Sequence, residues 1–388
     1  MHRATLRHQG SGLDGAGSPD GNRTVGSRIS PQIMDLAMQP SPPPLMTFGH
    51  LLSTTRHEID GRLLAIFDEE TSFAATCGPD AEAVLRAVRD LTMRGGKRAR
   101  PALAVAGFLA TPGAPRALLG AVHGVGVALE LLQSYLLIHD DWMDNDDVRR
   151  GGPAVHVLLQ KHHGDRRLGE ISAILAGDYA CALAQKALFA SLQGSSQGLA
   201  VAAAFARIQR DVVFGQILDV GGRTEDVERM HDLKTGSYTV QGPIELGALL
   251  AGASPRTLDA LRKYALPLGV AFQLCDDLLS AFGSEEVTGK PRGNDLRAGK
   301  RTAVVVEAER LLSPAEKTRI TGVFGRMDAS NEAIEGAILA LEQCGARAAV
   351  EARRDVLLQQ ALAALDSPAV EERPLLQDAA RALVIRSA

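Results

Sequence analysis

The sequence predicts an all-α protein, and three observations favour this fold class. From Phe48 onward, apolar residues such as Leu51, Ile59, Leu63 and Phe67 recur near the 3.6-residue period of a helix. Aromatic residues make up only 4% of the 388 residues, and a core of Ala, Leu and Val suits helices better than sheets. No run of residues alternates with a period of two for long enough to predict a strand.

Further helices are predicted along the whole chain after this first amphipathic stretch. Segments rich in Gly and Pro separate them and indicate turns. The predicted helices cover residues 80–93, 101–110, 114–144, 170–191, 197–220, 243–252, 256–283, 302–312, 330–342, 346–364 and 374–386. We expect a single helical domain over residues 47–388, because the distinctive polar motifs extend from Lys97 to Lys300 and must converge on one cavity to act together.

Residues 1–46 differ from the rest of the chain. They contain six Gly, six Pro and five Ser but no aromatic residue and no Cys. Such a segment buries too little apolar surface to offset its ordering entropy, which predicts a disordered tail. It also lacks the apolar stretch of a secretory signal. Alternatively the start codon is placed too early, and Met34, Met38 or Met46 begins the protein.

Charge and cysteine usage exclude several classes of protein. The chain has 42 Lys and Arg against 46 Asp and Glu, a net charge of −4, which argues against a nucleic-acid binder. Its four cysteines lie far apart without zinc-site or redox spacing, which favours a reducing cytoplasm. No transmembrane segment is expected, because the longest apolar candidate, residues 117–138, is interrupted by His123, Glu130 and Gln133.

Two aspartate clusters follow apolar helical segments. In the first, Asp140 and Asp144 are four residues apart and therefore share one helix face. Asp141 lies between them in the sequence. Carboxylates stacked near a helix C-terminus are unfavourable unless a cation lies between them. An all-oxygen ligand set indicates magnesium. The second cluster, Asp276 and Asp277, repeats the pattern.

Basic, glycine-containing runs flank both clusters. They cover residues 95–101, 149–153, 289–293 and 299–302. Arg and Lys are the usual partners of phosphate, and Gly lets the backbone approach a ligand closely. Magnesium in turn commonly binds one or two carboxylates together with substrate phosphates. The combination therefore predicts a substrate that carries a diphosphate.

With these motifs the chain resembles the trans-isoprenyl diphosphate synthase (polyprenyl synthetase) family from about residue 50 to the C-terminus. The segments Gly215–Asp219 and Lys234–Gly236 resemble two further motifs of that family. The resemblance implies a helical bundle around a deep central cavity, assembled as a homodimer. It also implies a prenyl transfer in which an allylic diphosphate ionises, isopentenyl diphosphate attacks the cation and a proton is lost.

The resemblance assigns roles residue by residue. The catalytic residues would be Asp140, Asp144, Lys234, Thr235, Gln273 and Asp276. Three magnesium ions would be bound by Asp140, Asp141, Asp144, Asp276 and Asp277. Isopentenyl diphosphate would be bound by Lys97, Arg100, Gln133 and Arg150. The allylic diphosphate would be bound by Arg149, Gln216, Asp219, Lys234, Thr235, Gln273, Lys290 and Lys300.

The chain departs from the family pattern at two positions. Ser280 stands where the second aspartate motif usually ends in Asp, and we expect Asp276 and Asp277 to preserve metal binding. Gln133 stands where many members have His beside the isopentenyl diphosphate, and its amide can still donate a hydrogen bond.

Tyr135 is the candidate that limits product length. It lies five residues before Asp140, about 7.5 Å along a helix at about 1.5 Å per residue. The neighbouring Leu136 is smaller, and no other aromatic precedes the aspartates on that helix. A lone aromatic here resembles short-chain synthases, which predicts geranylgeranyl diphosphate (C20) first and farnesyl diphosphate (C15) next. The alternative is that Tyr135 is an ordinary core residue.

Three other functions remain as alternatives. A class I terpene cyclase also uses an Asp-rich helix, but its second metal motif needs Glu where Ser284 stands. Glu285 is one residue out of phase, about 100° around a helix. A non-catalytic subunit of a heteromeric synthase would lose aspartates that this chain keeps. A structural helical-repeat protein predicts no clustering of Asp and Arg.

Overall fold

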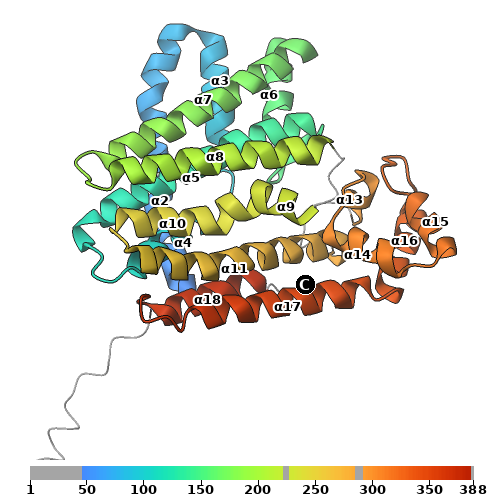
Figure 1. The fold of residues 1–388 in the computed structure, drawn as a ribbon. Coiled ribbons are helices and arrows are strands. Elements are labelled where there is room, and N and C mark those ends of the chain that lie inside the picture. Colours follow the sequence, from blue (N-terminus) through green and yellow to red (C-terminus); the bar gives the residue numbers. More distant parts are fainter. Residues whose placement is uncertain (1–45, 222–226, 285–291, 386–388) are drawn as a thin grey trace, which may run out of the picture. The chain divides into compact units, whose positions relative to one another are not determined.

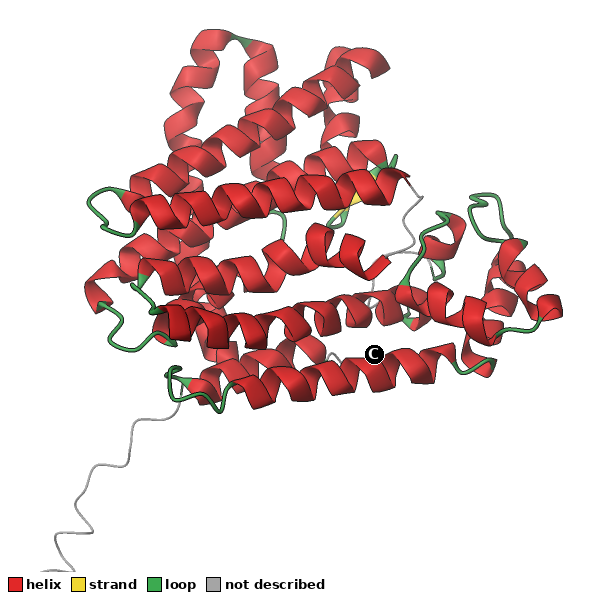
Figure 2. Cartoon of the chain, viewed as in Figure 1, coloured by secondary structure: helices red, strands yellow, loops and turns green. Residues whose placement is uncertain are grey.

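The structure is a computed structural model that describes residues 46–221, 227–284 and 292–385. Within these ranges the predicted all-α fold is confirmed, as Figure 2 shows. The strands in the described part are two residues each, β1 (Val148–Arg149) and β2 (Gly152–Pro153), paired antiparallel. Lys290 and all of the tail except Met46 lie outside the described residues.

The helices follow one another with short connections (Figure 1). In chain order they are α2 (Phe48–Cys77), α3 (Pro79–Met93), α4 (Ala99–Leu109), η1 (Arg116–Leu118), α5 (Leu119–Met143), α6 (Val155–His163), α7 (Arg166–Leu192), α8 (Gly198–Gly221), α9 (Val227–His231), η2 (Asp232–Gln241), α10 (Gly242–Leu250), α11 (Pro255–Phe282), α13 (Asn294–Arg297), α14 (Ala303–Leu311), α15 (Pro314–Thr321), α16 (Asn331–Gln343), α17 (Ala346–Ala364) and α18 (Arg373–Val384).

Most predicted helices agree with these bounds to within a few residues. The predicted helix at 114–144 begins later, at Leu119, because the 3₁₀ turn η1 precedes it. Apolar periodicity does not predict α6, α15 or η2. The reason is plainest for η2, a π-helix whose wider turn departs from the 3.6-residue period.

Local capping determines where the helices that carry the polar motifs begin. The Ser254 hydroxyl accepts a hydrogen bond from the Thr257 N–H, and Pro255 occupies the first position of α11. The Thr302 hydroxyl caps α14 in the same way through the Val305 N–H. These caps fix the register of α11 and α14, and therefore the places of Asp277 and of the basic run before α14.

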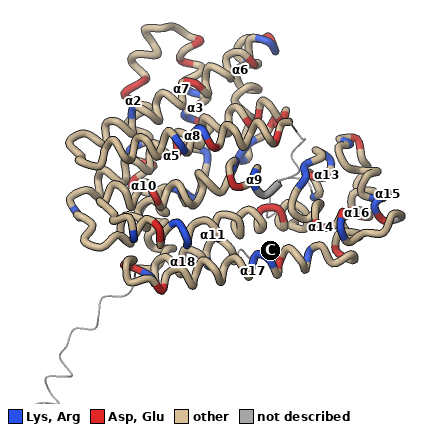
Figure 3. Tube along the Cα trace, in the orientation of Figure 1, with Lys and Arg blue, Asp and Glu red and all other residues tan. Residues whose placement is uncertain are grey.

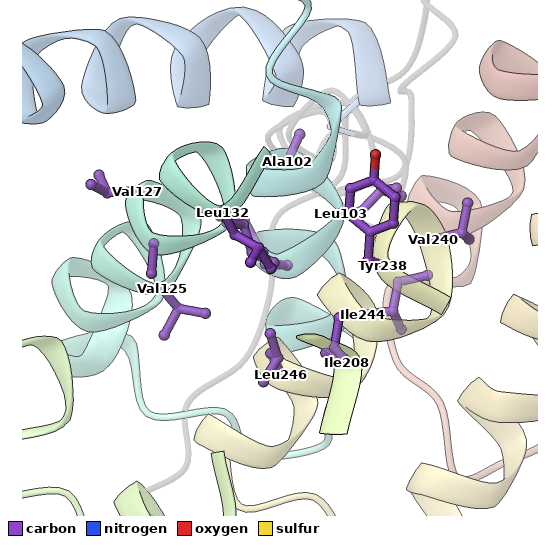
Figure 4. Close-up of a cluster of buried hydrophobic side chains, with 14 of the residues drawn as sticks. Ala102, Leu103, Val125, Val127, Leu132, Ile208, Tyr238, Val240, Ile244 and Leu246 are labelled. Atoms are coloured by element: carbon purple, nitrogen blue, oxygen red, sulfur yellow. The ribbon is translucent and has the colours of Figure 1, made fainter. Parts of the chain in front are cut away.

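The helices pack around α5. It contacts α7 on one side and α4 on the other, and α10 packs against α4 and α8. In Figure 1, α8, α10, α11 and α17 form successive rows, and each neighbouring pair is in contact. Figure 4 shows buried Leu103, Leu132, Ile208, Val240 and Leu246, which come from five different elements and form one core.

A smaller second core lies under the C-terminal helices. It contains Leu274 of α11, Val304 of α14 and Ile338 of α16. Among the described residues, Arg116–Met143 and Pro255–Phe282 are long and apolar enough to cross a membrane. However, 72% and 56% of their most apolar windows are buried inside the protein, as in core helices.

Candidate active site

The carboxylates of the first aspartate cluster each lie beside a cation from another element. Asp140 lies in the last turn of α5, and Asp144 caps that helix. Asp140 Oδ1 accepts hydrogen bonds from Lys234 Nζ and from Gln216 Nε2, both at 3.2 Å. Asp144 Oδ2 lies 2.8 Å from Lys300 Nζ. Arg149 lies 3.6 Å from Asp140 as well. The structure therefore brings four predicted site residues together around Asp140 and Asp144: Lys234, Gln216, Lys300 and Arg149.

Asp141 is placed differently from its neighbours. It is fully buried and pairs with Arg149, whose Nε lies 2.5 Å from Asp141 Oδ1. Burial, only partly opposed by Arg149, raises the pKa of Asp141 to about 6. The two residues were expected to bind metal and diphosphate, and the structure pairs them with each other. This pairing holds the Arg149 guanidinium beside Asp140.

The charges in this cluster keep both Asp140 and Lys234 ionised. Burial alone would raise the pKa of Asp140, but the charges of Lys234, Lys300 and Arg149 outweigh it and hold that pKa below its ordinary value. Burial would likewise lower the pKa of Lys234, but Asp140 and Asp219 raise it. Lys234 Nζ lies 2.5 Å from Asp219 Oδ2. The site thus carries fixed charges of both signs.

Close packing of α8 against η2 brings these groups into reach. A Cβ atom on Gly215 would lie 2.3 Å from the backbone nitrogen of Lys234, so only glycine permits this approach. The next residue, Gln216, consequently reaches Asp140, and Asp219 reaches Lys234. Lys234 and Thr235 both lie on the π-helix η2, an irregular form that is frequent at functional sites.

The second aspartate cluster lies within α11. Asp277 is buried and accepts hydrogen bonds from Gln273 Nε2 at 2.8 Å and from the Ala303 N–H at 2.7 Å. Burial raises its pKa, although His231 and these hydrogen bonds oppose the shift. Asp276 is half-buried on the same helix. Gln273, predicted to be catalytic and to bind the allylic diphosphate, donates its amide N–H to Asp277 in the structure.

A segment between α13 and α14 connects the two clusters. Ser280 of α11 donates a hydrogen bond to Asp295 of α13. The Lys300 N–H donates to the Asp295 carbonyl at 2.9 Å, and the Lys300 ammonium reaches Asp144. Figure 3 shows acidic and basic segments together where α9, α11 and α13 lie near one another. Ser280, the departure from the family pattern, therefore contacts a carboxylate supplied by another helix.

An apolar cavity of about 420 Å³ opens beside Asp140. Its polar side is formed by Asp140, Gln216, Lys234 and Thr235, and Tyr135 and Leu136 also line it. Val212, Val213, Ile217, Val220 and Tyr238 complete the apolar walls together with Leu137, His139, Met143 and Gly221. Burial raises the pKa of the half-buried Tyr135. The predicted chain-length residues thus share one cavity with Asp140, a predicted metal ligand.

A second basic group adjoins this cavity through Tyr238. The Arg100 guanidinium lies 4.3 Å over the Tyr238 ring and donates to Thr239 Oγ1 at 2.8 Å. Arg150 is half-buried, and burial lowers its pKa. Gln133 is buried, and its Oε1 has no hydrogen-bond partner in the described part of the chain. Lys97 is exposed.

Sequence reasoning missed the structural role of Arg98, which belongs to the same basic run as Arg100. Arg98 is 3% exposed and forms ion pairs with Glu130 at 2.6 Å and with Asp60 at 2.8 Å. It has a left-handed backbone conformation just before α4, with φ 52°. Its position inside the basic run 95–101 suggested phosphate contact. Glu130, noted only as a break in an apolar helix, was the available signal for a buried ion pair.

Together these features define a class of enzyme. Two acidic helix segments and several basic side chains can bind a diphosphate, and the adjoining apolar cavity can hold a hydrocarbon tail. The model of the polyprenyl synthetase family matches residues 81–341. The chain belongs to this family, and it is a trans-prenyltransferase.

Relatives and a solved structure agree with this assignment. A short chain isoprenyl diphosphate synthase of Methanothermobacter thermautotrophicus is 36% identical over 68% of this chain and 78% of its own. A geranylgeranyl diphosphate synthase of Methanosarcina mazei is 36% identical over 68% and 77%. The geranylgeranyl pyrophosphate synthase of Corynebacterium glutamicum, crystallised with isoprenyl diphosphate and magnesium, matches with a TM-score of 0.81. It is 33% identical over 88% of this chain and 100% of that chain.

Proposed function

We propose that this protein condenses isopentenyl diphosphate with allylic diphosphates and releases geranylgeranyl diphosphate (C20) as its main product, with farnesyl diphosphate (C15) next. The observation that carries the proposal is the shared cavity, in which Tyr135 lies five residues before Asp140 on α5, about 1.4 helical turns away. A prenyl chain whose diphosphate is bound near Asp140 would extend toward Tyr135. Two of the three relatives described above are geranylgeranyl diphosphate synthases.

Magnesium fits the acidic residues of the site. Asp140, Asp144 and Asp276 offer half-buried oxygen ligands of the kind that Mg²⁺ prefers. When bound, Mg²⁺ supplies positive charge that stabilises the departing diphosphate. We assign these three residues as ligands of about three ions, the number that the family resemblance implies. Asp141 and Asp277 support them from buried positions.

The basic residues separate into two substrate sites. Lys234, Lys300, Arg149 and Lys290 would bind the allylic diphosphate, with Gln216, Asp219, Thr235 and Gln273 around it. Lys97, Arg100, Arg150 and Gln133 would bind isopentenyl diphosphate. The unpartnered oxygen of Gln133 supports a polar ligand or water beside it, because a buried acceptor without a partner is costly. All of these residues belong to the proposed catalytic domain, residues 47–388.

We also propose a cytoplasmic homodimer. Leu168, Ile171 and Leu175 form an exposed apolar row along α7, at positions spaced three and four apart. Phe214 is likewise exposed on the neighbouring helix α8. Contiguous apolar surface of this kind marks an interface, and a second copy of the chain is the occupant that the family resemblance implies.

One incubation series tests the proposed reaction. The protein is mixed with Mg²⁺, isopentenyl diphosphate and each of the C5, C10 and C15 allylic diphosphates, and product length is measured. We expect C20 to predominate from every starter. Hydrocarbon released without isopentenyl diphosphate would indicate a terpene cyclase instead. No elongation from any starter would indicate a non-catalytic subunit.

A further inference from the structure

Two histidines and an aspartate converge at the junction of α3, α6 and α7. His162 and His163 end α6, and Asp80 lies in the first turn of α3. His162 Nε2 is 2.8 Å from Asp80 Oδ1, and His163 Nδ1 is 3.9 Å from the same oxygen. The three ligand atoms all lie within 4.8 Å of one another. None of these residues belongs to the prenyl-transfer site.

The way in which the two histidines meet is unusual for neighbours on a helix. Successive side chains point about 100° apart around the axis and normally diverge. Here His162 offers Nε2 and His163 offers Nδ1, and their rings meet edge to face with centroids 4.8 Å apart. Ligand atoms of a tetrahedral zinc site are about 3.4 Å apart when each bond is about 2.0–2.1 Å. The separations from Asp80 Oδ1, 2.8 Å to His162 and 3.9 Å to His163, lie on either side of that value. The shorter one is a hydrogen bond that His162 Nε2–H donates to Asp80, so a bound ion would replace this proton.

A second observation concerns the other nitrogen of His163. His163 Nε2 lies 2.9 Å from the Ser172 hydroxyl of α7. Only 13% of the His163 side chain is exposed, so packing restricts the orientation of its ring. A metal-binding histidine typically has its non-ligating nitrogen hydrogen-bonded in this way, which fixes the tautomer and the ring direction. In the tautomer whose Nε2–H donates to Ser172, Nδ1 carries the lone pair that an ion beside Asp80 would accept.

We propose that Asp80, His162 and His163 bind a divalent transition-metal cation, with Zn²⁺ preferred and water as the fourth ligand. Two imidazoles and one carboxylate suit zinc, whereas magnesium prefers oxygen ligands. The Asp80 side chain is 74% exposed, so an ion can reach it from solvent. The bound ion joins the start of α3 to the end of α6, and Ser172 extends the connection to α7.

Equilibrium dialysis with Zn²⁺ alone as the probe tests this site. The full-length protein is first stripped of metal with a chelator, and excess Mg²⁺ is added to occupy the aspartate clusters. We expect one Zn²⁺ per chain. Binding should weaken more than about 100-fold in His162→Ala and in Asp80→Asn. Ser172→Ala should weaken it about tenfold, because His163 loses its orienting partner.

A matched control and a spectroscopic signature complete the test. His57→Ala removes an exposed histidine of α2 and should leave Zn²⁺ binding unchanged. Co²⁺ in place of Zn²⁺ should give the visible absorption of an imidazole-bound ion, and this absorption should be lost in His163→Ala. Circular dichroism establishes that each variant is folded. Equal zinc stoichiometry in the wild type and in His162→Ala, or no zinc bound by the wild type, would overturn the proposal.

Discussion

Asp140 and Asp144 each lie next to a lysine, and under the proposed function each lysine changes partner when substrate binds. In the structure Lys234 and Lys300 neutralise these carboxylates at 3.2 and 2.8 Å. Bound magnesium adds positive charge and a bound diphosphate adds negative charge. Each carboxylate can then pair with the metal, and each lysine ammonium can pair with a phosphate. The balance of charge in the buried site is then kept, which limits the desolvation cost of binding.

Tyr135→Ala should lengthen the product. Removal of the phenol ring enlarges the cavity beyond the position that a C20 chain reaches, so further condensations can occur. Mass spectrometry of the products measures the change in length. Tyr179→Ala is a matched control, because Tyr179 bonds to Glu70 and does not line the cavity. An unchanged product distribution in Tyr135→Ala would remove this residue as the floor.

Asp295→Asn should raise the Mg²⁺ concentration needed for half-maximal rate. Asp295 contacts Ser280, so it supplies a carboxylate near the position where the family usually has Asp. Ser280→Ala should have a smaller effect, about fivefold, because it removes one hydrogen bond worth about 1 kcal/mol. Asp328→Asn, on an exposed residue, is the control. Identical Mg²⁺ dependence in Asp295→Asn and the wild type would contradict this role.

At this scale the sequence predicts residue types better than it predicts partners. The spacing of Asp140 and Asp144 predicts that they share one helix face; in the structure Asp140 lines the cavity and Asp144 pairs with Lys300. The same reasoning predicts that Asp141 also binds metal. However, Asp141 is one residue further around the helix, so its side chain is buried and pairs with Arg149. The contact between Ser280 and Asp295 depends on the path of the chain between α11 and α13. The spacing of residues in the sequence does not predict that path.

At the scale of elements, the junction of α8 and η2 determines the site geometry. Gly215 allows the backbone of α8 to approach that of η2. Neither the π-helix nor this approach follows from apolar periodicity, since both depend on contacts between segments. The long helices could be predicted because their apolar faces repeat regularly over many turns.

Gly215→Ala should therefore impair both stability and turnover. The added methyl would overlap backbone atoms of Lys234, and such overpacking typically costs about 1–3 kcal/mol. Urea unfolding and the steady-state rate measure the two effects. In the control, Gly61→Ala on α2, the new methyl meets nothing within 4 Å. That variant should gain up to about 1 kcal/mol from helix propensity. A Gly215→Ala protein as active and stable as the wild type would contradict this reasoning.

At the scale of the whole molecule, residues far apart in sequence meet around the first aspartate cluster. Lys300 reaches Asp144 across more than 150 residues, and Lys234 reaches Asp140. The family motifs predict that these residues meet. The exposed apolar row on α7 could not be predicted, because the sequence does not show which apolar residues are exposed.

The proposed dimer gives a prediction at the same scale. The double variant Ile171→Glu with Leu175→Glu places charge in the apolar row of α7 and should shift the protein from dimer to monomer. Sedimentation velocity measures the change. Val356→Glu alters an equally exposed apolar residue on α17 and should leave the dimer intact. A wild type that sediments as a monomer would refute the dimer.

Under the proposed function, Asp140 and Asp144 bind the metal that drives prenyl transfer. Incorporation of labelled isopentenyl diphosphate into prenyl product, with and without Mg²⁺, tests it most directly when Asp140→Asn is compared with the wild type. We predict that incorporation requires Mg²⁺ and an allylic starter, and that it falls at least about 100-fold in Asp140→Asn. Incorporation that persists after chelation of metal, or that is unaffected by the substitution, would show that Asp140 is not a ligand of a required metal.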